Sequence, residues 1–130
     1  MIFLLSLPAL VMAFATVYLI PSRVEPAFWL AIFVFCAWRV ARNIKGKLMQ
    51  FYHGFAIAIF NSFWITVVHL SFVNDYLKLN PGMQEMYDNP AIANHPRLTM
   101  AIFGICIGII SGLVLGFFCL VAGRMQKKQN

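Results

Sequence analysis

Long apolar runs, broken by short polar stretches, dominate the pattern along this chain. Four stretches are apolar almost throughout, at about residues 1–20, 26–42, 52–73 and 98–122. A helix needs about 20 mostly apolar residues to cross the hydrocarbon core of a bilayer. The pattern therefore predicts an all-α fold with a single domain over residues 1–130. We expect a polytopic bundle of four transmembrane helices, with one longer loop at 74–97.

The first two stretches need separate arguments. Residues 1–20 occupy the position of a signal peptide, but they lack a basic start and end in the bulky Tyr18-Leu19-Ile20. A signal peptide would carry a basic start and small residues at its cleavage site, so we expect a retained span. The second stretch is short, and it crosses fully only if Arg39 and Arg42 extend their charged groups to the lipid headgroups.

Two of the predicted spans carry small residues at a spacing of four, which places them on one face of a helix. These helix-packing candidates are, in the third and the fourth span respectively, Gly54, Ala58, Ser62, Thr66 and Gly104, Gly108, Gly112, Gly116. Small residues on one face let two helix backbones approach closely in a membrane. We expect the two stripes to face one another, or one of them to form an oligomer face.

The composition supports the membrane assignment and excludes other classes. Apolar residues make up 62% of the chain and charged residues 11%, and the mean hydropathy is +0.80. A soluble domain has about 45–50% and 25% respectively, and a disordered chain is richer still in charge. Three cysteines, all within predicted spans, do not form a disulfide scaffold, and we interpret them as small packing residues.

Charged residues are distributed unevenly between the two sides that the spans define. Seven basic residues and no acid lie on the side of the 41–51 loop and the tail: Arg39, Arg42, Lys45, Lys47, Arg124, Lys127 and Lys128. The other side holds three basic residues and all four acids: Arg23, Lys78, Arg97, Glu25, Asp75, Glu85 and Asp88. The net charges are +7 and −1, so the positive-inside rule predicts cytoplasmic termini and an outward-facing 74–97 loop. The basic pI of about 9.6 does not indicate nucleic-acid binding, because these residues flank the spans and form no stripe with interleaved aromatics.

The most polar residues near the predicted spans are candidates for a pore or a ligand site. They are Asn61, His69 and His95. His53 and His69 lie 16 residues apart on one helix, at opposite faces of the membrane, so the histidines cannot form a zinc site together. Two histidines near the outer surface could still ligate a haem. We expect no metal and no cofactor, and we keep a haem- or quinone-associated subunit as the second alternative.

Enzymatic activity is not expected. An intramembrane protease or acyltransferase needs a nucleophile beside a base, or paired carboxylates. Ser62 and His69 are two helical turns apart, and Glu85 and Asp88 lie in the polar loop. No Asp, Glu or Lys lies in the middle of a predicted span, which argues against an ion-coupled exchanger. The first alternative is an oligomeric channel or carrier for a small solute or ion, lined by Asn61, Ser62, Thr66 and His69.

Three segments carry a resemblance over most of the chain, at the level of architecture. They are Gly46-Lys47 to Gly54, Met83-Gln84-Glu85-Met86-Tyr87-Asp88-Asn89-Pro90 and Ile110-Ser111-Gly112-Leu113. Their order, after a two-span hairpin, resembles uncharacterised four-span bacterial membrane proteins classed as domains of unknown function. The resemblance implies a basic cytoplasmic loop, an outer Met-rich loop and a glycine-rich last span, and it implies no activity.

We therefore expect a small, non-catalytic integral membrane protein of the bacterial inner membrane. It would act as a structural or accessory subunit that packs through its small-residue helix faces, within a larger membrane complex or a homo-oligomer. Its expected partners are the lipid bilayer and other transmembrane subunits or further copies of itself, with no nucleic acid.

Overall fold

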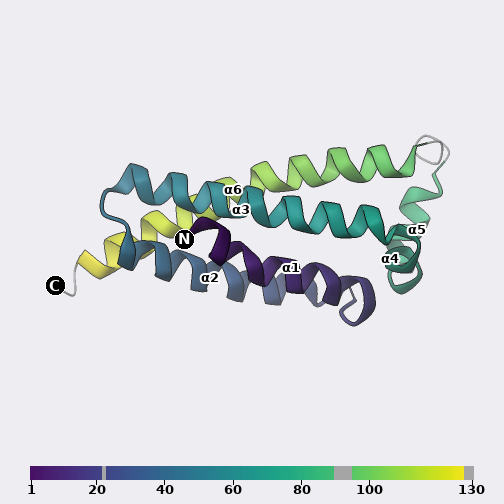
Figure 1. The fold of residues 1–130 in the computed structure, drawn as a ribbon, viewed down its shortest axis with the longest axis horizontal. Coiled ribbons are helices and arrows are strands. Elements are labelled where there is room, and N and C mark those ends of the chain that lie inside the picture. The colour runs from purple at the N-terminus through teal and green to yellow at the C-terminus, as the bar shows by residue number, and fades with distance from the viewer. Residues whose placement is uncertain (22, 90–94, 128–130) are drawn as a thin grey trace.

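A computed structural model describes residues 1–21, 23–89 and 95–127, and its regular structure there is all α-helical. The helices are α1 (Ile2–Tyr18), α2 (Glu25–Asn43), α3 (Lys47–Ser71), α4 (Val73–Leu79), α5 (Pro81–Tyr87) and α6 (Pro96–Lys127) (Figure 1). This confirms the all-α prediction. Pro90 of the outer segment and Lys128 of the tail lie outside the described residues.

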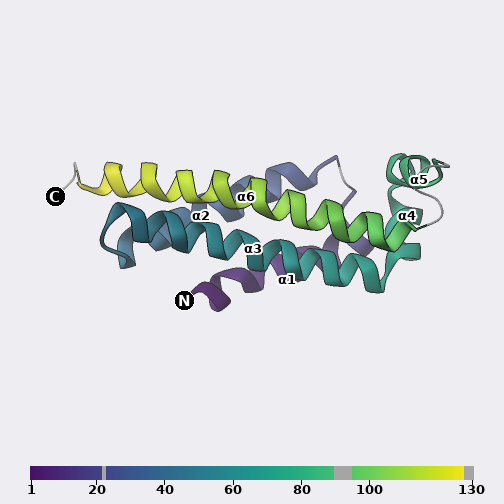
Figure 2. The same ribbon diagram turned by 90° about the horizontal axis from the view of Figure 1, so that it is seen from above.

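The four longer helices lie along one common direction, and successive ones run in opposite senses (Figures 1 and 2). The most extensive contact joins the antiparallel helices α3 and α6. Helix α1 packs against α3, and α2 packs against α6. We call one end of the bundle the basic end, which holds the α2–α3 turn and the last turns of α6. The opposite end, with the α1–α2 turn, α4 and α5, holds all four acids and is called the acidic end.

Two apolar cores lie along the bundle. The basic-end core includes Cys36, Ile57 and Leu115, and joins α1, α2, α3 and α6. The acidic-end core includes Val68 and Tyr76, and joins α1, α3, α4, α5 and α6. Each core therefore depends on contacts between helices that are far apart in the sequence.

The turn between α2 and α3 is shorter than the 41–51 loop that the sequence predicts. It is closed by Gly46, whose φ of +95° lies in the left-handed region that side chains rarely adopt. Gln50, in the first turn of α3, donates an Nε2–H to the carbonyl of Ile44 at 2.8 Å and lies against Gly123 of α6. This side chain therefore ties the turn to the end of α6.

The predicted outer loop is largely helical. Helix α4 continues from α3 after a break at Phe72, and α5 follows directly after Asn80. The Met-rich part of the predicted loop forms α5, which ends at Tyr87. Helix α6 begins at Pro96, where a missing N–H has no cost.

Large apolar side chains cover the outside of the bundle, while the fully buried positions are mostly small or polar. The buried set includes these residues with 0–1% exposure: Ser6, Ala9, Ala13, Thr16, Cys36, Ala58 and Cys119. Leu4, Val11 and Ile105 are 67%, 69% and 64% exposed. Helix α6 contributes more exposed large apolar side chains than any other described helix.

Two of the described helices, α3 and α6, are long and apolar enough to cross a membrane, which suggests membrane association. Helix α1 is apolar but only 17 residues long. Helix α2 carries Glu25 at its start and Arg39 and Arg42 near its end, and it does not meet the same criteria.

Candidate functional site

The two small-residue stripes meet along the seam between α3 and α6. A Cβ added at Gly108 would lie 2.9 Å from the Ser62 side chain, and one added at Gly104 would overlap Thr66. A Cβ at Gly54 would lie 2.9 Å from the Leu115 carbonyl oxygen and 3.0 Å from the Gly116 Cα. Backbones at this separation leave no room for a side chain between them. The glycine face of α6 is therefore covered by α3 within one chain.

Phenylalanine rings fill the other positions of the seam. The rings of Phe51 and Phe55 are stacked with centroids 6.3 Å apart, and they lie over Gly116 and Gly112. Ala58, the remaining member of the α3 stripe, is 1% exposed in the basic-end core. The glycines of α6 thus leave space for aromatic side chains of α3 as well as for its small side chains.

The four residues expected to line a pore do not face one channel. The Ser62 hydroxyl donates to the Gly104 carbonyl at 2.6 Å, and Thr66 lies against Gly104, so both face α6. His69 instead contacts Thr16 of α1, at 2.9 Å between Nε2 and Oγ1. The side chains of Ser62 and His69 therefore serve different helix interfaces.

His69 lies in a polar contact that joins three helices. The Thr16 hydroxyl donates to the Ala13 carbonyl at 2.9 Å, so its oxygen accepts the proton of His69 Nε2. This pattern assigns the Nε2–H tautomer to His69 and leaves the lone pair on Nδ1. The imidazole also stacks on Tyr76 of α4, with ring centroids 4.1 Å apart and a 24° interplanar angle. The His69 ring thus makes one hydrogen bond and one stacking contact within the bundle.

A second polar contact joins α1 and α3 closer to the basic end. The Trp64 indole donates to the Ser6 hydroxyl at 3.2 Å, and this hydroxyl donates to the Phe3 carbonyl at 2.8 Å. The Phe3 ring also meets Trp64 edge-on, with centroids 6.2 Å apart. Helix α1 is therefore held on α3 by two polar and aromatic contacts, and both lie on the acidic-end side of Asn61.

Asn61 is the exception among the buried polar side chains. It is 2% exposed, and neither Oδ1 nor Nδ2 has a hydrogen-bond partner in the described part of the chain. Its position on α3 falls between Ala58 of the basic-end core and Ile65 beside the acidic-end core. A buried amide without partners costs roughly 1–3 kcal/mol. Such a group is either an unrelieved cost of the fold or a contact point for a polar ligand.

Tyr76 closes the acidic end over His69. It is 7% exposed, and burial, aided by the nearby charges of Glu25 and Tyr87, raises the pKa of its phenol to about 12. Burial also raises the pKa of the Glu25 carboxyl, against a hydrogen bond from Trp29 that lowers it. The phenol of Tyr76 is thus neutral at physiological pH, and it serves as an aromatic cover and not as a base.

The histidines do not gather into a metal site. In the described residues, no three or more His, Cys, Asp or Glu side chains lie close enough to hold an ion. His95 is exposed in a groove with Val73 and Asn74, whereas His69 is buried beside Thr16. His53 lies on the first turns of α3, where its Nδ1 is 2.8 Å from the Met49 carbonyl. A haem on His69 and His95 would have to displace the contacts that His69 makes.

A double-mutant cycle tests the Thr16–His69 contact. Thr16→Val removes the acceptor, and His69→Phe keeps a ring against Tyr76 while removing the donor. We expect a coupling of about 0.6–1.7 kcal/mol in the free energy of unfolding, the range of interhelical hydrogen bonds in a membrane. The control cycle pairs Thr16→Val with Ser71→Ala, whose hydroxyl bonds only within α3, and should give no coupling. Equal coupling free energies in the two cycles would mean that Thr16 and His69 do not form this hydrogen bond.

The acidic end should lose stability in strong alkali. Because the Tyr76 pKa is higher in the folded chain than the usual value near 10, the unfolded chain releases this proton first. The free energy of unfolding should therefore stay level below about pH 10 and fall as the pH rises towards 12. Tyr76→Phe should remove much of this fall, and Tyr18→Phe, at a half-exposed tyrosine, should leave it. An identical alkaline profile for Tyr76→Phe would contradict the assignment.

Sequence reasoning missed Tyr76, Gln50 and Thr16. Tyr76 lies in a segment predicted as an outer loop. No sequence motif around it indicates a contact with His69, seven residues earlier. Gln50 lies in the first turn of a helix that begins with a basic residue, and a polar residue is ordinary at such a position. Thr16 is a small hydroxyl residue in an apolar helix, whose back bond to Ala13 is common.

Comparisons with protein-family models, with curated proteins and with solved structures found no match to this chain.

Proposed function

We propose that this chain is a small, non-catalytic integral membrane protein with four spans and both termini in the cytoplasm. The observation that carries the proposal is the distribution of side chains, with many large apolar groups outside and mostly small or polar groups at the fully buried positions. In water this arrangement would expose far more apolar surface than a soluble monomer tolerates. In a bilayer it is favourable, because lipid solvates the large side chains and small residues allow close helix packing.

The two ends of the bundle support the proposed orientation. Seven basic residues and no acid belong to the basic end, and all four acids belong to the acidic end. The positive-inside rule therefore assigns the basic end to the cytoplasm. Helices α1 and α2 are the short spans, and Arg39 and Arg42 on α2 reach the headgroups from within the helix end.

We propose further that the protein is a structural or accessory subunit, which binds other transmembrane subunits or a second copy of itself. The glycine face of α6 is occupied by α3, so this face is not the one that a partner contacts. The outward face of α6 remains, with Ile102, Ile109 and Leu113 exposed along it. This face is the candidate docking surface for another membrane helix.

Extraction in a mild detergent tests the proposed role. We expect a particle heavier than one chain, with a second component or a second copy at fixed stoichiometry. Leu113→Trp, at a residue 52% exposed on this face of α6, should reduce the recovery of that component. Leu4→Trp, at a residue 67% exposed on α1, is the matched control and should not. A monodisperse single chain from native membranes would overturn the subunit role and leave the membrane proposal standing.

A channel or carrier is the second candidate function, and it is favoured by Asn61. An unpaired amide midway along a bundle interior is a contact point that a polar solute could use. The proposal predicts flux of a small solute into vesicles that contain the protein, and a loss of that flux in Asn61→Leu. Flux no greater than that of empty vesicles would overturn it.

A further inference from the structure

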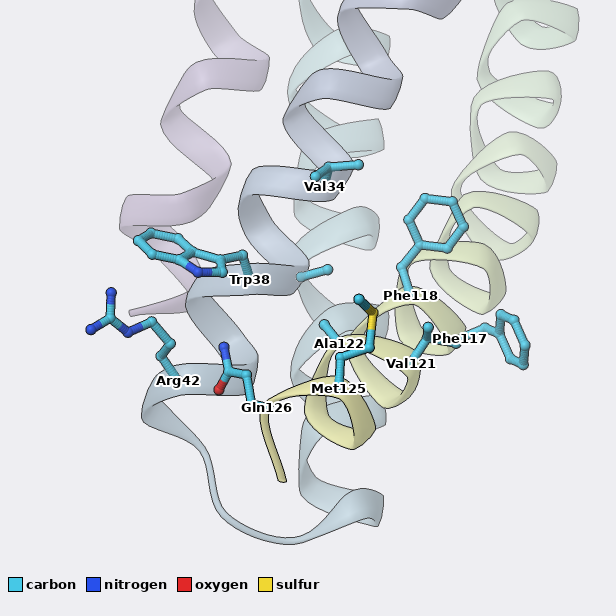
Figure 3. A pocket seen from close by; sticks show the side chains of 10 residues that line it. Val34, Trp38, Arg42, Phe117, Phe118, Val121, Ala122, Met125 and Gln126 are labelled. Atoms are coloured by element: carbon cyan, nitrogen blue, oxygen red, sulfur yellow. The ribbon is translucent and has the colours of Figure 1, made fainter. Parts of the chain in front are cut away.

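A groove between α2 and α6 opens at the basic end of the bundle. Its volume is about 940 Å³, and Figure 3 shows its walls, with Trp38 and Arg42 on α2 and Phe118 and Met125 on α6. Except for Arg42 and Gln126, the residues that line it are apolar: Val34, Ala37, Trp38, Phe117, Phe118, Val121, Ala122 and Met125. We propose that this groove binds one anionic phospholipid of the cytoplasmic leaflet, with an acyl chain along the groove and the phosphate at Arg42. The inference rests on the proposed membrane embedding.

The depth of the groove fits one lipid leaflet. From Val34 to Arg42 the α2 wall rises by eight residue steps, which is about 12 Å along a helix. Half of the hydrocarbon core of a bilayer is about 15 Å. An acyl chain that starts at the level of Arg42 would thus reach the middle of the membrane near Val34. A peptide helix fits this groove less well than an acyl chain does, because the groove ends at the charged side chain of Arg42.

Arg42 supplies the group that distinguishes an anionic lipid from a neutral one. Its guanidinium lies over the Trp38 ring, 4.9 Å from the centroid. A guanidinium over a ring keeps N–H donors in its own plane, where they can bind a phosphate through two hydrogen bonds. The Trp38 ring thus holds the guanidinium on one side of α2, at the basic end of the groove (Figure 3).

The surrounding charge favours an anion at this place. Every Asp and Glu of the chain belongs to the acidic end, so no acidic side chain at the basic end competes for Arg42. Arg39 and Arg124 are exposed on the same two helices and add to the positive potential. The Gln126 amide lines the groove, where it can donate to a headgroup oxygen. The positive charge and the apolar lining of the groove thus both favour an anionic phospholipid.

Lipid retention measured by native mass spectrometry tests the inference. The full-length protein is reconstituted with equal amounts of phosphatidylglycerol and phosphatidylcholine that carry identical palmitoyl and oleoyl chains, and then released. We expect one phosphatidylglycerol to be retained with about fivefold preference, the effect of one basic side chain at an anionic lipid. Arg42→Gln should abolish this preference. Arg39→Gln, which removes the same charge one turn away but outside the groove lining, should retain it.

A second variant separates the groove from charge alone. Val121→Trp fills the groove from α6 without touching Arg42, and it should reduce the retention of both lipids. Equal retention of the two lipids by the unaltered protein would overturn the inference, as would equal losses in Arg39→Gln and Arg42→Gln. Extraction of the membranes with alkaline carbonate distinguishes the two proposals. Protein that stays in the membrane without lipid preference refutes the site alone, whereas protein that is extracted refutes the embedding.

Discussion

Gly54→Leu should destabilise the bundle more than any other single substitution in the seam, by about 3 kcal/mol or more. The nearest atom to a Cβ at this position is the Cys119 Sγ, at 2.7 Å, and the next two belong to the backbone of α6. A Cβ at this position would lie 2.9 Å from the Leu115 carbonyl oxygen and 3.0 Å from the Gly116 Cα, and the rest of the leucine has no space. A side-chain neighbour could rotate away, but here the whole of α6 must move. The movement would also separate the Ser62 hydroxyl from the Gly104 carbonyl.

The measurement is the free energy of unfolding in detergent micelles, followed by the loss of helical circular dichroism. Gly82→Leu is the matched control, because a Cβ at Gly82 meets nothing within 4 Å. We expect the control to lie within about 0.5 kcal/mol of the unaltered protein, as surface substitutions usually do. Gly54→Ala should fall between them, because the clash exceeds the gain in helix propensity of about 1 kcal/mol. Equal stability of Gly54→Leu and Gly82→Leu would mean that α3 and α6 are not in contact here.

Asn61→Leu should make the protein more stable, by about 1–3 kcal/mol. Asparagine and leucine have the same number of side-chain heavy atoms and the same branching, so the exchange removes polarity with little change of shape. Asn61 has no described partner for either polar atom, so no hydrogen bond is lost. A gain from a polar-to-apolar exchange is expected only where the native group is unpaired.

Asn80→Leu provides the contrasting control. Asn80 is also buried, at 3% exposure, but its Nδ2 donates to the Tyr76 carbonyl at 3.0 Å. Its replacement should lower the free energy of unfolding, because it breaks this hydrogen bond and leaves the carbonyl with one donor fewer. If Asn61→Leu lowers stability as much as Asn80→Leu does, the Asn61 amide has a partner within the folded protein.

Hydrophobic patterning predicted the long helices well, because their apolar runs are much longer than any turn. The second helix was predicted to begin near Pro26, and α2 begins at Glu25. The outer segment was harder to predict. Each of its helices has only seven residues, too few for periodicity to separate a helix from a loop. The break at Phe72 depends on tertiary packing of α4 against α1, which sequence spacing does not contain.

The spacing of small residues also predicted which of them share a helix face. It did not predict every residue that packs against those faces, such as Phe51 and Phe55. Gly104 and Thr66 were singled out by their fourfold spacing, and they lie against each other. Asn61 and Ser62 are adjacent in sequence and were grouped as pore residues, yet adjacent residues differ by about 100° around a helix. Ser62 accordingly faces α6, and the two adjacent side chains lie on different parts of the helix surface.

The central claim is that all four long helices cross the membrane, and cysteine labelling from one side tests it most directly. Single cysteines are introduced as Arg23→Cys, Lys45→Cys and Glu85→Cys, and intact cells are treated with a membrane-impermeant maleimide. The unaltered chain measures the background from its own cysteines, of which Cys36 and Cys119 are buried. Four spans predict labelling at positions 23 and 85 before permeabilisation, and at position 45 only afterwards. Labelling at positions 23 and 45 from the same side would contradict the account, because α2 would then not cross the membrane.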